Sequence, residues 1–523
     1  MTWLLETLPV PLRTALVHGS EGAAHLSSCA ALAAGAGLSR LHDELLLAAW
    51  AESPLDAVLA ARAAAVPDAP AVARELAAYV AANTAPPGDL AYYRRLAGRR
   101  DAEKIVRYLE SQAAKEPGNL FWDRLSLTHA MDGEDWERAA RIAAGLPEQL
   151  ARPLSGDIAM LRGDPATALA NYSRCARLWE APGLEARLGL AHLAAGDGDG
   201  ARSWLSASVA REPWRTQALF ALHDLSSGVR GLRSMPTGQV SVLLYTYNKA
   251  ADIGRTLESL FASELGAAKV IVLDNGSTDA TGGVLAAWRE KAGPGRFATV
   301  DLPVNVGAPA ARNWLMSLPD VRTSDWVVFL DDDVEMPPDW LGLLGAASRL
   351  YPEAGAWGAR VTDHSRPAHI QSADMFIVPE EGGEGRLFNL SSCHHQTLDR
   401  GQFSYCRPCA TVTGCCHLFM AERLSGGGFD LRYSPSQYDD LDHDIRLLLS
   451  GRSAACQGHL AVRHFKSTGS LGGEGQAQYG IGWANQFKLH RKFAPEDIRR
   501  AARTADEAAW ADALAKWRAL AKG

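Results

Sequence analysis

Three consecutive carboxylates follow a short apolar run in the second half of the chain. Residues 327–330 are strand-forming apolar residues, and Asp331, Asp332 and Asp333 come directly after them. A buried strand that ends in this way carries its acids to the edge of a sheet, where their mutual repulsion favours a bound cation. Mg²⁺ and Mn²⁺ prefer such oxygen ligands and often share them with a phosphate. The alternative is a helix N-terminus, where acids are also stabilised.

The composition limits the class of protein that carries these acids. The chain has 523 residues, of which 47% are apolar and 22% charged, as in soluble globular proteins of several domains. A net charge of −7 argues against a general binder of nucleic acids or membrane surfaces. Because the N-terminus does not resemble a signal peptide and charges interrupt every apolar stretch, we expect a cytoplasmic protein without an integral membrane segment. The eight cysteines are then expected to be reduced.

The first 230 residues are rich in Ala, Leu, Arg and Glu, with apolar residues at helical spacing. Gly133, Gly163 and Gly196 separate successive helical segments at intervals of 30 and 33 residues. This spacing resembles the tetratricopeptide repeat, whose period is about 34 residues, and it is clearest between residues 100 and 225. Such arrays present concave surfaces that bind peptide segments. The alternative is a helical spacer or a dimerisation module.

Strand and helix patterns alternate after a linker at residues 227–238. Such alternation predicts an α/β domain with a largely parallel sheet and helices on both faces. Ligands in such sheets bind beyond the carboxyl ends of the strands, where the polar clusters of this segment lie. The expected strands are residues 240–245, 270–273, 298–302 and 326–330, and the expected helices are residues 252–262, a segment through Leu285 and Trp288, and one from Ala308.

Eight short motifs occur in a fixed order between residues 239 and 470. They are Thr246-Tyr-Asn248, Asp274-Asn-Gly-Ser-Thr-Asp279, Asn305-Val-Gly307 through Ala311-Arg-Asn313, the acid triplet, Gly414-Cys-Cys, Gly427-Gly-Phe-Asp430, Tyr438-Asp-Asp-Leu-Asp442, and Val462-Arg-His464 with Gly469-Ser470. Together they resemble the family 2 glycosyltransferases, and most of all their rhamnosyltransferase-like branch. The resemblance implies a multidomain chain: an all-α, tetratricopeptide-like domain at 1–230, a Rossmann-like GT-A domain at 239–470, and a C-terminal helical extension at 471–523.

The resemblance implies a nucleotide-diphosphate sugar of the UDP, dTDP or GDP type as donor. A carboxylate at Asp274 can accept the imide N–H of uracil or thymine, although Asp-Asn-Gly-Ser also forms plain turns. Arg312 either reaches the nucleotide or pairs with the acids as a structural ion pair. The implied donor-binding residues are Thr246, Tyr247, Asn248, Asp274, Asn275, Asn305, Arg312, Asp331 and Asp332.

The same resemblance assigns metal and base roles. In the Asp-x-Asp motif, Asp333 would bind a divalent cation, Mn or Mg, Asp331 would bind either the ribose or the metal, and His464 would be the third metal contact. Imidazole suits Mn²⁺ better than Mg²⁺, although a lone histidine is more often only hydrogen-bonded. Asp440 takes the position of the family's general base and Asp439 that of its neighbouring glutamate, so which of the two acts is left open. An N-terminal helix cap is the simpler alternative for both.

A cysteine-rich segment allows a second metal. Cys393, Cys406 and Cys409, with a nearby histidine, have the residue types of a structural zinc site. Cys415 and Cys416 instead match small apolar positions of the family, where thiols would be buried.

These features predict an inverting, metal-dependent glycosyltransferase that acts on a hydroxyl acceptor. A helical array that binds polypeptide favours a protein acceptor, and the alternative is an enzyme of surface-polysaccharide synthesis. A hypothesis of another class is a non-catalytic scaffold, in which the repeats bind a partner and the second half only retains the fold. An intact acid triplet, together with Asp440 and His464, argues against a scaffold.

Overall fold

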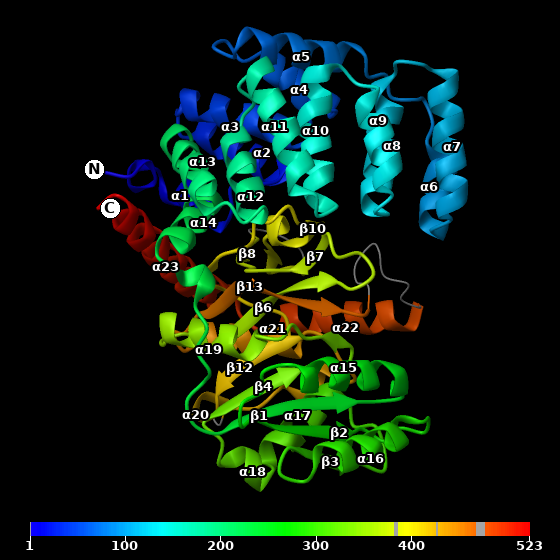
Figure 1. Ribbon diagram of the computed structural model, residues 1–523, viewed down its shortest axis with the longest axis vertical. Helices are drawn as coiled ribbons and strands as arrows, with labels where there is room; N and C mark the ends of the chain where they lie inside the picture. The colour runs from blue at the N-terminus through cyan, green and yellow to red at the C-terminus, as the bar shows by residue number, and fades with distance from the viewer. Residues whose placement is uncertain (1, 381–384, 425–426, 467–475, 523) are drawn as a thin grey trace. The chain divides into compact units, whose positions relative to one another are not determined.

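A computed structural model describes residues 2–380, 385–424, 427–466 and 476–522 (Figure 1). The chain divides into two compact units. The first comprises Met1–Leu222 and the short segment Leu398–Gln402, and the second comprises His223–Thr397 and Phe403–Gly523. The expected boundary between the transferase domain and its C-terminal extension, at residues 470 and 471, lies outside the described residues.

The first unit is helical in its described part, as the sequence predicted. Asp135, Asp164 and Asp197 each begin a helix by accepting a backbone N–H from the third residue beyond them, which explains the recurring Gly-Asp punctuation. The helices are α1 Val10–His18, α2 Ala23–Gly35, α3 Ser39–Glu52, α4 Ala57–Ala64, α5 Ala71–Ala82, α6 Ala91–Arg99, α7 Ala102–Lys115, α8 Leu120–Asp132, α9 Trp136–Ala144, α10 Glu148–Leu161, α11 Pro165–Leu178, α12 Leu184–Ala194, α13 Gly198–Arg211 and α14 Thr216–Ser226.

Successive helices of this unit approach closely at small residues. A Cβ atom on Gly156 of α10 would lie 2.2 Å from a ring atom of Tyr172 on α11. One on Gly189 of α12 would lie 2.6 Å from Cγ of Leu205 on α13. Only glycine allows these contacts without displacing the neighbouring helix.

A buried ion cluster lies inside the first unit. The guanidinium of Arg400, from the segment Leu398–Gln402, donates to Glu21, Glu52 and Asp157 at 2.8–3.1 Å. Arg187 donates to Glu52 and Asp157 as well. The carboxylates are thereby paired, as burial requires.

The second unit is built on a mixed sheet. Its strands run in the order β10-β7-β6-β12-β4-β1-β2-β3, and β13 pairs with β6, β5 and β11. The strands are β1 Val240–Thr246, β2 Lys269–Asp274, β3 Phe297–Asp301, β4 Trp326–Leu330, β5 Val334–Glu335, β6 Ala356–Asp363, β7 His369–Ser372, β10 His395–Leu398, β11 Cys406–Cys409, β12 Cys416–Met420 and β13 Ala454–His464. β8 Ile377–Pro379 and β9 Phe388–Leu390 form a separate two-stranded sheet.

The expected parallel sheet holds for only part of this array. β3, β2, β1 and β4 are parallel, as predicted, but β12 is antiparallel to both β4 and β6. β6 and β7 are also antiparallel, because only a short loop joins them and a parallel pair needs a long crossover.

Helices cover both faces of the sheet. Alternate side chains such as Val242 and Leu244 pack with Leu257 of α15 (Ala250–Ala262) and Leu344 of α19 (Trp340–Leu350). On the other face, Phe329 of β4 contacts the rings of β12 and of the loop before α21 (Asp439–Leu449). The remaining helices named here are α16 Thr281–Ala292, α17 Ala308–Ser317, α18 Pro319–Arg322 and α20 Ala421–Leu424.

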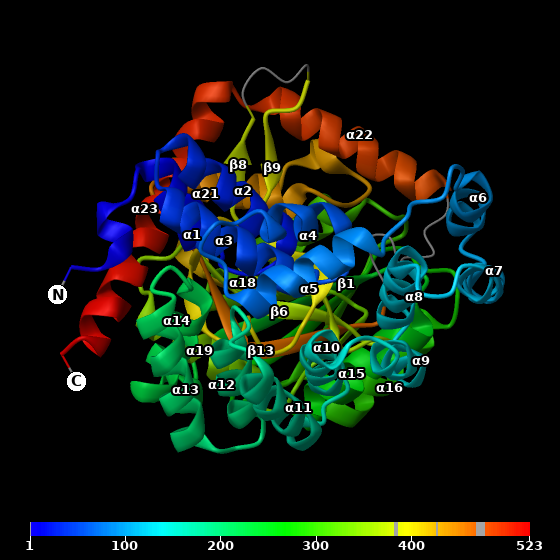
Figure 2. The same cartoon turned by 90° about the horizontal axis from the view of Figure 1, so that it is seen from above.

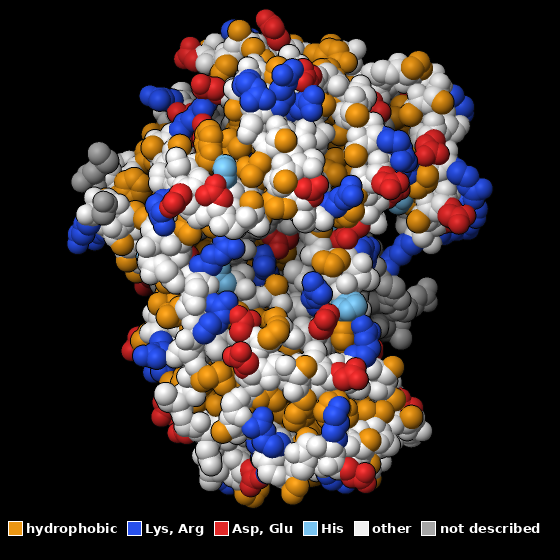
Figure 3. Space-filling model, in the orientation of Figure 1, with side chains coloured by type: hydrophobic (Ala, Val, Ile, Leu, Met, Phe, Trp, Pro, Cys, Tyr) orange, Lys and Arg blue, Asp and Glu red, His pale blue; other side chains and the backbone are white. Residues whose placement is uncertain are grey.

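Two long helices end the chain, as the sequence predicted. They are α22 (Gln476–Lys492) and α23 (Pro495–Leu520), and α23 packs against α21 and β11. Among the described residues, no helix is both long and apolar enough to cross a bilayer. Figure 3 shows basic and acidic side chains interspersed over the visible face rather than gathered into one field.

Candidate active site

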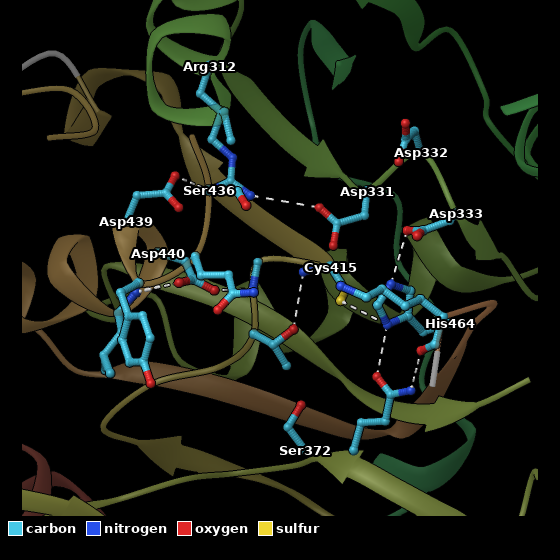
Figure 4. A pocket seen from close by; sticks show the side chains of 18 of the residues that line it. Arg312, Asp331, Asp332, Asp333, Ser372, Cys415, Ser436, Asp439, Asp440 and His464 are labelled. Atoms are coloured by element: carbon cyan, nitrogen blue, oxygen red, sulfur yellow. Dashed lines mark hydrogen bonds and ion pairs between the residues drawn. The ribbon is translucent and has the colours of Figure 1, made fainter. Parts of the chain in front are cut away.

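A pocket of about 750 Å³ lies in the second unit at the carboxyl ends of β1 and β4. Parallel strands present their carboxyl ends at one edge, which is why separate motifs converge there. In Figure 4, Asp439 and Asp440 lie on one side of the pocket and Asp333 and His464 on the other. The lining includes ten of the predicted site residues: Tyr247, Asn275, Asn305, Arg312, Asp331, Asp332, Asp333, Asp439, Asp440 and His464.

The acid triplet follows β4, and its three carboxylates have different surroundings. Asp332 and Asp333 are almost fully buried, and both accept from Nζ of Lys249, at 2.9 and 2.7 Å. Burial opposes the charge on Lys249, but the two carboxylates outweigh it and raise the pKa of this lysine. Asp331 is more exposed and points into the pocket towards Arg312 (Figure 4).

His464 ends β13 and reaches the triplet from the opposite direction. Its Nε2 lies 3.0 Å from Oδ1 of Asp333, and its Nδ1 lies 2.8 Å from Oε1 of Gln371. Both partners are acceptors, so each ring nitrogen is placed to donate a proton. A cation bound here would replace the proton on one of these nitrogens.

The residues present fit a divalent cation. Among the described residues, one group of three potential metal ligands has donor atoms that all lie within 4.8 Å of one another. It consists of Asp331, Cys415 and His464. Burial raises the pKa of the Cys415 thiol, so it stays protonated and is a poor ligand. The carboxylate of Asp331 and the imidazole of His464 are therefore the effective donors of this group, which does not include Asp333. Such oxygen and nitrogen donors suit Mn²⁺ better than Mg²⁺.

The charges around the pocket also favour a bound cation. The lining carries five carboxylates and three lysine or arginine side chains. The excess of negative charge is what a divalent cation would neutralise. The acids are Asp331, Asp332, Asp333, Asp439 and Asp440, and the bases are Lys249, Arg312 and Lys466.

Arg312 joins the two acidic groups. This buried side chain on α17 donates from Nη1 to Oδ2 of Asp439 at 2.5 Å, and its Nη2 lies 3.8 Å from Oδ1 of Asp331. Its guanidinium also lies over the rings of Tyr245 and Phe429. Arg312 therefore forms an internal ion pair with Asp439, while its contact with a nucleotide stays a prediction.

Among the described residues, no lysine or arginine forms an ion pair with Asp440. Its Oδ2 accepts from the backbone N–H of Gly414 at 2.8 Å, and its Oδ1 accepts from that of Leu441. A Cβ atom on Gly414 would lie 2.9 Å from both Nη2 of Arg312 and Oδ2 of Asp440. The glycine thus leaves room for both Arg312 and Asp440 at this point of the pocket.

The turn before these acids is strained. Gln437 and Tyr438 have φ angles of 76° and 70°, in the left-handed region that side chains rarely adopt. Nδ2 of Asn485, on α22, donates to the carbonyls of Tyr433 and Ser436 at 2.8 and 2.7 Å. Such backbone strain persists only where surrounding contacts enforce it, and it is common at functional sites.

The predicted nucleotide residues are held by one another. Asn275 donates to Oδ1 of Asn305 at 3.0 Å, which joins the loops that follow β2 and β3. Asp274 accepts from the N–H of Ser277, as in a turn, and Oδ1 of Asn248 accepts from the N–H of Thr278. The lining residues do not include Thr246, Asn248 or Asp274. The nucleotide-binding role of all the predicted residues stays a prediction.

The zinc hypothesis gains no support from the described residues. Cys393, Cys406 and Cys409 are buried thiols, and none belongs to the one candidate metal group among them. Burial raises the pKa of both Cys406 and Cys409, which disfavours the thiolate that zinc needs. A structural zinc stays a prediction that metal analysis would test.

Three neighbours of the site were not anticipated as functional. Lys249 follows the first motif directly, and this adjacency was a usable signal. Gln371, on β7, orients His464, but no pattern in its segment marks it. Gly414 was part of a motif, yet its role depends on distances that a sequence does not contain.

Replacing Arg312 by methionine should lower the free energy of unfolding of the second unit by about 3–5 kcal/mol, because Asp439 would be left buried and unpaired. Urea unfolding followed by tryptophan fluorescence measures this change. Arg289→Met is the matched control, since Arg289 is half exposed and contacts the exposed Asp301. Equal stabilities for the two variants would contradict the role given to Arg312.

The sequence of the second unit was also compared with known protein families. Residues 241–422 match Glycosyl transferase family 2, a segment that runs from β1 into α20 and includes the acid triplet, Arg312 and Gly414. The second unit therefore contains a family 2 glycosyltransferase domain, as the motifs predicted. Asp439, Asp440 and His464 lie beyond the matched segment.

Individual known proteins and solved structures are also similar to this chain. N-acetylglucosaminyl-diphospho-decaprenol L-rhamnosyltransferase of Mycobacterium tuberculosis, from strains CDC 1551 / Oshkosh and ATCC 25618 / H37Rv, is 27% identical over 251 residues, which is 44% of this chain and 77% of the relative. A mannosyltransferase of Pyrobaculum calidifontis with GDP-Man and Mn²⁺ is 18% identical, covers 62% of this chain and 86% of its own, and has a TM-score of 0.36. GalNAc-T7 with UDP, GalNAc and Mn²⁺ is 11% identical, covers 49% of this chain and 47% of its own, and has a TM-score of 0.37.

Proposed function

We propose that the protein is an inverting, metal-dependent glycosyltransferase that moves a sugar from a nucleotide diphosphate to a hydroxyl acceptor. The observation that supports this most is that the acid triplet and Asp440 line one pocket of about 750 Å³. Pockets of this size are typical of small-molecule and cofactor sites. The family match at residues 241–422 supports the same chemistry.

Binding of the donor is divided between two groups of residues. Asp331, Asp333 and His464 would hold the cation, which offsets the charge that develops on the departing diphosphate. Tyr247 and the paired Asn275 and Asn305 face the same pocket and are placed to contact the nucleotide, which we propose is of the UDP, dTDP or GDP type.

Transfer then needs one base. Asp440 takes the proton of the acceptor hydroxyl as its oxygen attacks the anomeric carbon, while the bond from that carbon to the diphosphate breaks. Attack from the face opposite the leaving group inverts the carbon, and no nucleophile of the protein is used. Asp439 is tied to Arg312 and serves to hold that arginine beside Asp331.

The acceptor is one of two kinds. A helical unit that binds polypeptide favours a protein acceptor. The name of the mycobacterial relatives instead describes transfer to a sugar on a polyprenyl diphosphate, which supports a lipid-linked precursor of a surface polysaccharide. Either kind of acceptor would present a hydroxyl group to Asp440.

The test uses the full chain with Mn²⁺ and a set of UDP-, dTDP- and GDP-linked sugars. We expect one donor to raise the melting temperature, to be turned over only with the metal, and to yield a product of inverted anomeric configuration by NMR. Chelation by EDTA should stop turnover, and added Mn²⁺ should restore it. If no donor is bound or hydrolysed, the scaffold hypothesis is the better one.

A further inference from the structure

Helix α22 presents a row of aromatic side chains to solvent. Tyr479, Trp483 and Phe487 are four residues apart, so they share one face of the helix. Their exposed fractions are 40%, 74% and 60%, although side chains of this size are normally buried. Leu431, in the short turn that packs against α22, is 58% exposed. These four residues are called the α22 apolar face below.

Basic residues surround this face. Arg491 lies over the ring of Phe487 at 5.3 Å, and Lys488 donates to the carbonyl of Arg432 at 2.7 Å. Arg386 and Arg432 are also exposed. The nearby acid Asp430 is paired with Lys492 and Arg432, so its charge is compensated.

Exposed aromatic side chains along a helix with basic side chains beside them are typical of helices that lie in the membrane interface. Tryptophan and tyrosine prefer the headgroup region, and lysine and arginine attract anionic lipids. Figures 1 and 2 show α22 as an outer helix of its unit. The composition therefore favours a lipid surface over a polypeptide.

The inner side of the same helix contacts the turn that precedes the candidate active-site acids. Asn485 binds the turn that leads into Asp439 and Asp440, and a Cβ atom on Gly482 would lie 2.7 Å from Oε1 of Gln437 in that turn. Gln437 and Tyr438 also line the pocket. A membrane on the outer side of α22 would thus lie beside the acceptor end of the pocket.

We propose that the α22 apolar face docks the protein on an anionic phospholipid surface, so that a lipid-linked acceptor reaches Asp440 from the membrane. The docking stands on the composition and exposure of this face alone. Its use in presenting an acceptor rests on the proposed function. The net negative charge of the whole chain does not oppose it, because screening confines the effect of charge to about 10 Å.

The test is sedimentation of the full chain with vesicles of phosphatidylcholine alone or mixed with phosphatidylglycerol. We expect binding to the mixed vesicles that weakens with added salt, and at least about tenfold weaker binding for Trp483→Ser/Phe487→Ser. Arg491→Glu should reduce the preference for phosphatidylglycerol. Trp314→Ser on α17 is the matched control, since Trp314 is 48% exposed outside this face and should bind vesicles as the unaltered protein does.

Two results would overturn the proposal. One is that the unaltered protein sediments with neither kind of vesicle, and the other is that the double variant binds as tightly as the control. If the double variant loses transfer to a protein acceptor while vesicles are never bound, the face is a protein-binding surface instead. Affinity for the soluble donor is measured in parallel and should be unchanged in the double variant, so a failure of docking is distinguishable from a failure of the transferase.

Discussion

Turnover of the Asp440→Asn variant should fall by about 10²–10⁴-fold, the usual contribution of a general base. The amide retains the shape of the carboxylate but cannot accept a proton from the attacking hydroxyl. Because Asp440 is bonded only to backbone N–H groups among the contacts described above, its replacement leaves Arg312 and the metal ligands in place. Affinity for the donor, measured by calorimetry with Mn²⁺, should therefore stay unchanged while the rate of product formation collapses.

Two further variants make this result specific. Asp497→Asn places the same change in the first turn of α23, on an exposed surface, and should leave turnover unaltered. Asp439→Asn should impair stability as well as turnover, because it removes the charge that holds Arg312. If Asp440→Asn retained full turnover while Asp439→Asn lost it without unfolding, the base would be Asp439.

The second large effect is expected at the metal ligands. Asp333→Asn should weaken Mn²⁺ binding at least about 100-fold, since even residues that only support a ligand change metal affinity by about 10–100-fold. Free Mn²⁺ is counted directly by electron paramagnetic resonance, so this readout does not depend on transfer. Lys249→Met should act in the opposite direction, because its ammonium lies 2.7 Å from Oδ2 of Asp333 and competes with the cation.

Lys269→Met is the control for the lysine, since Lys269 pairs with the exposed Asp320 at a distance from the pocket. Unchanged Mn²⁺ affinity in both Asp333→Asn and Lys249→Met would contradict the metal site. If Asp333→Asn also left donor binding and metal-dependent turnover unaltered, the chain would function as a scaffold.

Much of the fold follows from local pattern. The apolar runs predicted β1, β2 and β4 closely, and the helix after Asp439 and the last long helix were also predicted correctly. The antiparallel half of the sheet was not predicted. Between β6 and β12 its strands follow one another through loops and short turns rather than α-helices, so the strand-helix alternation that identifies parallel pairs is missing between residues 356 and 420.

The site was predicted in part for a different reason. Asp331 and Asp333 follow a strand whose end was expected at the ligand edge of the sheet, whereas His464 was placed beside them only by the family resemblance. The sequence left open whether Asp439 or Asp440 is the base, because the answer depends on which carboxylate Arg312 contacts. The part played by Lys249 likewise depends on the path of a side chain and not on spacing.

The bare backbone at Gly414 has a consequence for gene history. A single base change converts a glycine codon to alanine, and the added methyl group would press on both Arg312 and Asp440. A single point mutation at this codon is therefore expected to shift both side chains. If the proposed transfer is the selected function, related genes that retain it should also retain this glycine codon.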